Sequence, residues 1–224
     1  MMTSAEKYEQ FYTTQPEDFY AAQMKTKGLR HVWFKRRQVM ARRLIEKYFK
    51  GGLVLDVGCG NCVWNNMNIP TLGIDISDAM LKYNTSSMRN FYPLKANILY
   101  GLPVKDSSVN IVVITEVLEH FVNYSFLINE IKRVLKPGGV VIGSVPYALF
   151  PGLWGVLFPI WCTYKWLRYK DKYYLNRCGH KIKFSVKKIV NSLEGFGVLR
   201  VDTIGLLTIF FVADKINNDN DEVA

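Results

Sequence analysis

The chain has few of the residues on which metal-binding and disulfide-rich proteins depend. Its 224 residues include four cysteines and three histidines. Cys59 and Cys62 form one C-x-x-C pair, whereas Cys162 and Cys178 stand apart, so the spacing fits neither a disulfide framework nor a zinc site. We therefore expect free thiols, no bound metal and a reducing, cytoplasmic location.

Acidic residues are also scarce. There are 19 Asp and Glu against 29 Lys and Arg, which gives a formal net charge of +10. Such an excess favours anionic partners, among them nucleic acid, a membrane surface or a phosphorylated metabolite. Composition alone does not choose among these three.

An unbroken apolar segment is missing as well. Residues 137–164 carry no charge, and a run of this length is long enough to span a bilayer. However, Pro146, Pro151, Pro159 and several glycines interrupt it, and such residues suit a lipid-exposed helix poorly. The sequence favours a strand followed by irregular structure here.

Most of the chain alternates short apolar runs with amphipathic helices. An arm over residues 1–28, expected to be mobile or lightly packed, precedes a predicted helix over residues 30–50 that ends at two glycines. The β-branched run Val109–Ile114 is typical of a strand covered on both faces. The alternation predicts an α/β fold, a Rossmann-like, doubly wound, mostly parallel sheet with helices on both faces. The expected strands cover residues 53–57, 71–74, 91–96, 109–114, 140–145, 197–201 and 206–212, and further helices are expected after Ser77 and over residues 123–135 and 185–194.

The segment LVLDVGCGNC (Leu53–Cys62) predicts a nucleotide-binding loop. A buried strand leads into glycines that let a ligand approach the backbone, and Asp75 at the end of the next strand can accept hydrogen bonds from ribose hydroxyls. Dinucleotide binding would need glycine where Val63 stands. Asp56, two residues before the first glycine, suits a ligand with an amino group and a sulfonium better than a pyrophosphate.

Four motifs in order, LVLDVGCGNC, GIDIS (Gly73–Ser77), ITEVLEHF (Ile114–Phe121) and EIKRVLKPGG (Glu130–Gly139), resemble the class I S-adenosylmethionine (SAM)-dependent methyltransferases, in particular their "type 11" group. The resemblance spans residues 30 to 205 and implies a seven-stranded sheet whose last strand is antiparallel. It divides the chain into an arm and helix (1–50) and a SAM-binding domain (51–224) with an aromatic and basic lid insertion at about 147–181.

The resemblance also implies which residues bind the cofactor. They are Asp56, Gly58, Cys59 and Gly60 at the amino-acid end of SAM, Asp75 at the ribose, Ile76, Asn97 and Ile98 at the adenine, and Thr115 beside the methionine portion. Two positions depart from the family pattern, because Cys62 replaces a usual glycine and Asn97 a usual acid. Asn97 can still accept a hydrogen bond through its carbonyl oxygen.

Three residues are candidates for catalysis, namely Glu116, His120 and His180. Glu116, Glu119 and His120 would share one face if the turn after the fourth strand were helical. A similar Glu-x-x-Glu-His in quinone-type O-methyltransferases can hold a divalent cation, but the same residues can equally line the pocket or pair with an arginine. His180 can be a base or a packed histidine. His31 is expected to be structural, and Arg36 or Arg37 to lie on a solvated helix face or to reach the cofactor carboxylate.

Aromatic residues followed by basic ones dominate residues 147–178, where no regular structure is predicted. This composition fits an active-site lid, a contact with a membrane surface, or an insertion that packs on its own domain. The leading interpretation is a methyltransferase acting on an oxygen of a small hydrophobic or lipid-linked acceptor, cytoplasmic or peripheral at the membrane. The alternatives are an RNA methyltransferase and a non-catalytic SAM-binding protein, and the oligomeric state stays open.

Overall fold

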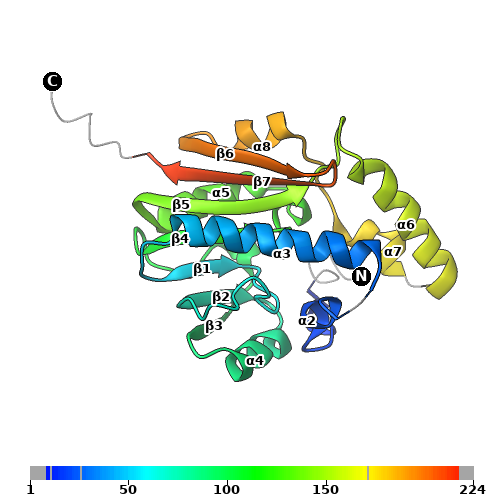
Figure 1. Cartoon of the computed structure of the whole chain (residues 1–224), viewed down its shortest axis with the longest axis horizontal. Helices are drawn as coiled ribbons and strands as arrows, with labels where there is room; N and C mark the ends of the chain where they lie inside the picture. The colour runs from blue at the N-terminus through cyan, green and yellow to red at the C-terminus, as the bar shows by residue number, and fades with distance from the viewer. Residues whose placement is uncertain (1–8, 11, 26, 171, 217–224) are drawn as a thin grey trace.

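The computed structural model describes residues 9–10, 12–25, 27–170 and 172–216. A twisted sheet lies between two helical layers, and further helices lie beyond one end of it (Figure 1). The helices are α2 (Phe19–Gln23), α3 (Leu29–Tyr48), α4 (Asp78–Ser87), α5 (Tyr124–Val134), α6 (Trp154–Tyr169), α7 (Lys172–Leu175) and α8 (Val186–Ser192), with 3-10 turns η1 (Ile98–Tyr100), η2 (Leu118–His120) and η3 (Arg177–Gly179). The strands are β1 (Val54–Val57), β2 (Thr71–Asp75), β3 (Phe91–Lys95), β4 (Val109–Thr115), β5 (Leu135–Pro146), β6 (Phe196–Ile204) and β7 (Thr208–Lys215).

Within the described residues the seven strands form one sheet in the order β3-β2-β1-β4-β5-β7-β6. Strands β1 to β5 pair in parallel, and β7 runs antiparallel to both β5 and β6. The predicted fold class is confirmed, including the antiparallel last strand. In such a sheet the carboxyl ends of β1, β2 and β4 meet at one edge, where ligands bind.

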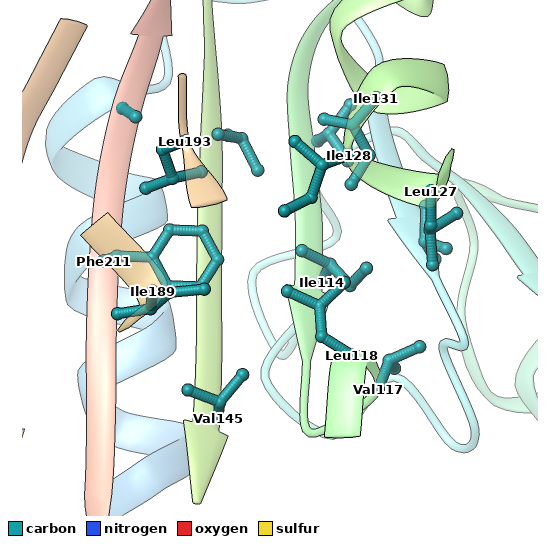
Figure 2. Packing of buried hydrophobic residues seen from close by; sticks show 14 of the residues in the cluster. Ile114, Val117, Leu118, Leu127, Ile128, Ile131, Val145, Ile189, Leu193 and Phe211 are labelled. Atoms are coloured by element: carbon teal, nitrogen blue, oxygen red, sulfur yellow. The ribbon is translucent and has the colours of Figure 1, made fainter. Parts of the chain in front are cut away.

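The strands are covered on both faces, as the β-branched run in β4 predicts. Ile111 and Val113 contribute to the hydrophobic cluster under α3, and Val112 and Ile114 to the cluster under α5 and α8. Figure 2 shows Ile128 and Ile131 of α5 facing β4, and Ile189 of α8 and the following Leu193 beside Phe211 of β7.

The segment Lys136–Gly139 was expected to separate a helix from a strand, and this boundary is wrong. Helix α5 ends at Val134, and β5 already begins at Leu135, which pairs with Val109. The pairing register then shifts between Val109 and Ile111, and Gly138 adopts a φ of 68°. A glycine tolerates this backbone, so the strand accommodates the irregularity and continues through it.

The prediction that regular structure lapses over residues 147–181 is also wrong, because α6 occupies 16 of them. Its inner side carries Trp154, Phe158 and Cys162 at a spacing of four residues, and these pack against Cys178 of η3. This packing offsets the cost of Pro159 inside the helix. The sulfurs of Cys162 and Cys178 lie 4.0 Å apart, and all four cysteines are free thiols, as expected.

Within the uncharged run of residues 137–164, the first part, up to Pro146, belongs to β5 and the last part, from Trp154, belongs to α6. No helix in the described part of the chain is long and apolar enough to cross a membrane. Helix α6 instead lies beside the carboxyl end of β5, next to the edge of the sheet where the candidate site forms (Figure 1).

Candidate functional site

The loop after β1 and the carboxylate at the end of β2 form one hydrogen-bonded unit. The backbone N–H of Gly60 donates to Oδ2 of Asp75 at 2.8 Å, and the N–H of Ser77 donates to Oδ1 at 2.9 Å. Gly58 and Gly60 have positive φ values of 67° and 47°. A side chain at Gly58 would meet Val117 at 2.7 Å, so this tight turn requires glycine.

Burial raises the pKa of Asp75, and the hydrogen bonds from the Ser77, Gly60 and Ile76 backbone oppose that rise. A carboxylate fixed in this way has its orientation determined before any ligand binds. Asp75 is therefore preorganised to accept further hydrogen bonds from a ligand.

Asp56, at the end of β1, is buried and turned toward a tryptophan. Its Oδ2 accepts a hydrogen bond from Nε1 of Trp64 at 2.7 Å. Burial raises the pKa of Asp56 to about 6, against the lowering effect of hydrogen bonds from Trp64 and Cys62. Trp64 could not be singled out from the sequence, because its contact with Asp56 depends on how the loop closes.

Cys62 itself adopts a φ of 46°, a left-handed conformation that favours glycine. Its side chain is buried in the hydrophobic cluster beneath α3. This left-handed backbone explains why the class I methyltransferases that the sequence resembles usually have glycine at this position.

A cavity of about 70 Å³ lies at the carboxyl edge of the sheet. Of the residues predicted to bind the cofactor, Gly58, Asp75, Ile76, Asn97 and Ile98 line it, together with the catalytic candidates Glu116 and His120. The remaining lining residues are Tyr12, Tyr20, Ile74, Ala96, Val117 and Phe121. Asp56, Cys59, Gly60 and Thr115 are not part of the lining, and the Oδ1 atom of Asn97 accepts a hydrogen bond from the N–H of Leu99.

The N-terminal arm covers this cavity, which the sequence did not predict. Asn61 holds the arm, since its Oδ1 accepts from the N–H groups of Tyr20 and Ala21 and its Nδ2 donates to the carbonyl of Glu17. The Tyr20 ring lies 2.7 Å from where a Cβ on Gly60 would stand. The described part of the arm is thus docked rather than lightly packed, and residues 1–8 lie outside the described residues.

Pockets for drug-sized ligands measure roughly 300–1,000 Å³. The cavity under Tyr12 and Tyr20 is several times smaller. A nucleoside-sized ligand needs more room than this cavity provides.

Glu116 lies beside the cavity in an ion pair. Its Oε2 is 3.5 Å from Nη1 of Arg37, and its Oε1 accepts from the Ser144 hydroxyl at 2.8 Å. The Arg37 guanidinium also lies over the Trp33 ring, 4.6 Å from its centroid. Arg37 thus points into the site, whereas Arg36 is exposed.

The other two catalytic candidates, His120 and His180, come together around Glu119. Oε1 of Glu119 is 3.7 Å from Nε2 of His120 and 4.0 Å from Nε2 of His180, and the two rings meet edge to face at 4.8 Å. Glu116 lies outside the η2 turn with a φ of 56°, so the shared helical face does not form. The group whose ligand atoms lie within 4.8 Å of one another is therefore Glu119, His120 and His180. It offers one carboxylate oxygen and two imidazoles, which are ligand types for a divalent transition metal.

Burial is the main cause of the shifted pKa values in this cluster. It lowers the pKa of His120 to about 4, with a smaller lowering by the Lys181 charge and an opposing hydrogen bond to the Gly179 backbone. Burial likewise holds the pKa of His180 well below its usual value, and burial with the nearby Glu116 charge raises the pKa of Glu119 well above its usual value. At neutral pH both imidazoles are uncharged, and His120 can accept a proton.

Stacked aromatic rings form a wall beside the histidines. Trp33 stacks on Trp154 at 4.8 Å, Trp154 on Phe158 at 4.9 Å, and Phe158 on His180 at 4.6 Å. Helix α6 provides the two middle rings, so it joins the site through its inner side. His31, expected to be structural, lies 3.3 Å from the Gln23 carbonyl oxygen and outside this wall.

Comparison with known proteins gives a family match over residues 55–143, described as a methyltransferase domain. A probable S-adenosylmethionine-dependent methyltransferase of Mycolicibacterium smegmatis is 33% identical over 122 residues, covering 51% of this chain and 45% of that protein. A demethylmenaquinone methyltransferase of Staphylococcus epidermidis is 32% identical over 121 residues, covering 50% and 48%. The chain thus spans less than half the length of these two relatives.

A solved structure of a geranyl diphosphate methyltransferase in complex with GPP and sinefungin has a TM-score of 0.68 to this chain at 12% identity. The likeness covers 96% of this chain and 99% of that one. Such a likeness confirms the Rossmann-like fold. The family match and the relative from Mycolicibacterium smegmatis confirm the resemblance to SAM-dependent methyltransferases over the matched residues.

Proposed function

We propose that this chain, whose residues 55–143 match the methyltransferase-domain family, binds SAM and transfers its methyl group to an oxygen of a small hydrophobic or lipid-linked acceptor. The observation that supports this most is Asp75, held by two backbone amides on the cavity wall beside Ile76 and Asn97. Asp75 would accept the ribose hydroxyls, Ile76 would pack on the adenine, and Asp56 would attract the cofactor's amino group.

Bound SAM supplies an activated methyl group, so the chain itself must hold the acceptor, exclude water and accept a proton. The aromatic wall of Trp33, Trp154 and Phe158 suits an apolar acceptor. His120, uncharged and in the cavity lining, would take the proton of an acceptor hydroxyl, with His180 in contact with the acceptor. A demethylmenaquinone methyltransferase among the relatives agrees with an apolar acceptor.

The direct test is transfer of labelled methyl from SAM into cell extract, followed by separation of lipid from RNA. We expect label in the organic phase, and roughly 10- to 100-fold less when the Asp75→Ala variant replaces the protein at a SAM concentration below the Kd. An RNA methyltransferase is the second candidate, favoured by the net charge of +10. Label in RNA, with binding that weakens steeply as salt rises, would replace the proposal by that candidate. SAM binding without transfer to any fraction would favour a non-catalytic role.

The pKa of about 6 at Asp56 predicts how SAM affinity depends on pH. The carboxyl loses its charge as pH falls through 6, while the amino group of the ligand stays positive. We expect the Kd for SAM, measured by calorimetry, to rise between pH 7 and pH 5 by up to roughly tenfold per pH unit below 6.

The matched control is Asp56→Asn, whose side-chain oxygen can still accept the Trp64 hydrogen bond. This variant should bind SAM weakly and without pH dependence in the same range. The contribution of Asp56 to stability, taken as the difference between the ligand-free unaltered protein and Asp56→Asn, should move the other way. Because the folded pKa lies above the ordinary 3.8, ionisation of Asp56 weakens folding as pH rises from about 4 to 6. A constant Kd from pH 7 to 5 in the unaltered protein would contradict the role of Asp56.

A further inference from the structure

Helix α6 has two unlike faces. Its inner face packs through Trp154, Phe158 and Cys162. Its outer face is a stripe of exposed aliphatic and aromatic residues at intervals of three and four positions, and it runs the length of the helix. We call it the outer stripe. The outer stripe consists of Leu153 (47% exposed), Val156 (61%), Leu157 (49%), Ile160 (63%), Tyr164 (61%) and Leu167 (55%).

The apolar surface continues beyond the start of the helix. Phe150, in the turn before α6, is 94% exposed, and the adjacent Leu149 is 38% exposed. Exposed apolar side chains that occur singly need no explanation, but a contiguous patch marks an interaction site. The outer stripe forms such a patch along α6, and the exposed Leu149 and Phe150 precede it in the chain.

Basic residues border the patch where α6 ends. Lys165 lies 4.7 Å from the Tyr169 ring centroid, and Arg168 and Lys170 are exposed on the following turn. The charged residues between residue 140 and residue 170 are Lys165, Arg168 and Lys170, all of them basic. The charge at this end of α6 therefore complements an anionic surface.

We propose that α6 binds the surface of an anionic lipid bilayer, with the outer stripe at the acyl boundary and the basic residues at the headgroups. A helix that lies in the interface needs an apolar face, aromatic rings at the boundary and cations beside them, and α6 has all three. Its 16 residues are fewer than the roughly 20 that span a bilayer, which agrees with a helix lying flat.

This position would connect the bilayer with the candidate site. The inner face of α6 stacks Phe158 on His180, so the helix has the bilayer on one side and the cluster of histidines on the other. Delivery of a lipid-linked acceptor rests on the proposed function, whereas bilayer binding does not require any methyl transfer.

The test is co-sedimentation of the full chain with vesicles of phosphatidylcholine containing phosphatidylglycerol, compared with phosphatidylcholine alone. We expect at least tenfold tighter binding to the anionic vesicles. The double variant Val156→Glu/Ile160→Glu should lower that binding at least tenfold, because both side chains are largely exposed and their loss leaves the core intact. The matched control is Tyr92→Glu/Leu199→Glu, which alters two exposed apolar residues on β3 and β6 and should bind as the unaltered chain does.

Calorimetry with SAM separates the two proposals. If the α6 variant still binds SAM but not vesicles, bilayer binding is established independently of catalysis. Vesicle binding unchanged in that variant would overturn the proposal, as would no preference for anionic vesicles. If the unaltered protein forms a dimer and does not bind vesicles, and the Val156→Glu/Ile160→Glu variant is monomeric, the patch is an interface with a second copy of the chain instead. RNA binding without vesicle binding would also overturn it.

Discussion

Replacing Asp75 by alanine is expected to weaken SAM binding by roughly 10- to 100-fold. The carboxylate would accept hydrogen bonds from the ribose hydroxyls, and a net loss of about 1.5–3 kcal/mol, the contribution of one hydrogen bond to a charged group, corresponds to this range. Asp75 is already oriented by the Gly60 and Ser77 N–H groups, so little entropy is lost when the ligand binds. The measurement is the Kd for SAM by calorimetry at pH 7.5, where Asp56 is ionised.

The control for this variant is Asp78→Ala, three residues further along. Asp78 is exposed and pairs with Lys82 on the surface of α4, so its loss should leave the Kd unchanged. A thermal melt of each variant shows whether the loop after β1 has lost its order, because Asp75 also fixes that loop. Unchanged affinity in a folded Asp75→Ala protein would refute the ribose role.

The parts of the fold that the sequence predicted are those governed by local pattern. In β4, Val112 and Ile114 pack under α5 while Ile111 and Val113 pack under α3, and a continuous apolar run is the signal of such burial on both faces. The parallel order follows because strands joined by helices must cross over in one sense. Asp75 and Asn97 could be placed near each other for the same reason, since each follows a parallel strand.

The features missed by the sequence reading depend on contacts between distant segments. Pro159 argued against a helix, yet α6 forms because Trp154 stacks on Trp33 and Cys162 packs on Cys178. The docked arm depends on Asn61, whose amide holds backbone groups about 40 residues earlier in the chain. Local propensity has no information about either partner.

The sequence likewise predicted some residues of the candidate site and missed others. Residues at strand ends, such as Gly58 and Asp75, line the cavity, because topology alone brings them to one edge. Glu119 was expected to share a helical face with Glu116, but that face does not form, and its Oε1 lies near His180, some sixty residues further along the chain. The positive φ at Glu116 turns that side chain toward Arg37 and Ser144, and nothing in a four-residue spacing reveals such a turn.

Replacing His120 by glutamine is expected to lower kcat by about 100-fold while the Kd for SAM stays within a factor of about two, since a general base contributes 10²–10⁴-fold. The assay uses the lipid fraction that accepts label, at saturating SAM. The base acts while uncharged, and the pKa of His120 is about 4, so kcat of the unaltered protein should stay level down to about pH 5 and fall only below it.

His180→Phe is the informative companion, because phenylalanine can keep the stack on Phe158 while removing the ring nitrogen that faces Glu119. If His180 contacts the acceptor through that nitrogen, this variant raises KM for the acceptor more than it lowers kcat. Partial recovery of His120→Ala by added imidazole would identify proton removal as the lost step. If His120→Gln retains kcat within a few-fold, His120 is not the general base of the reaction.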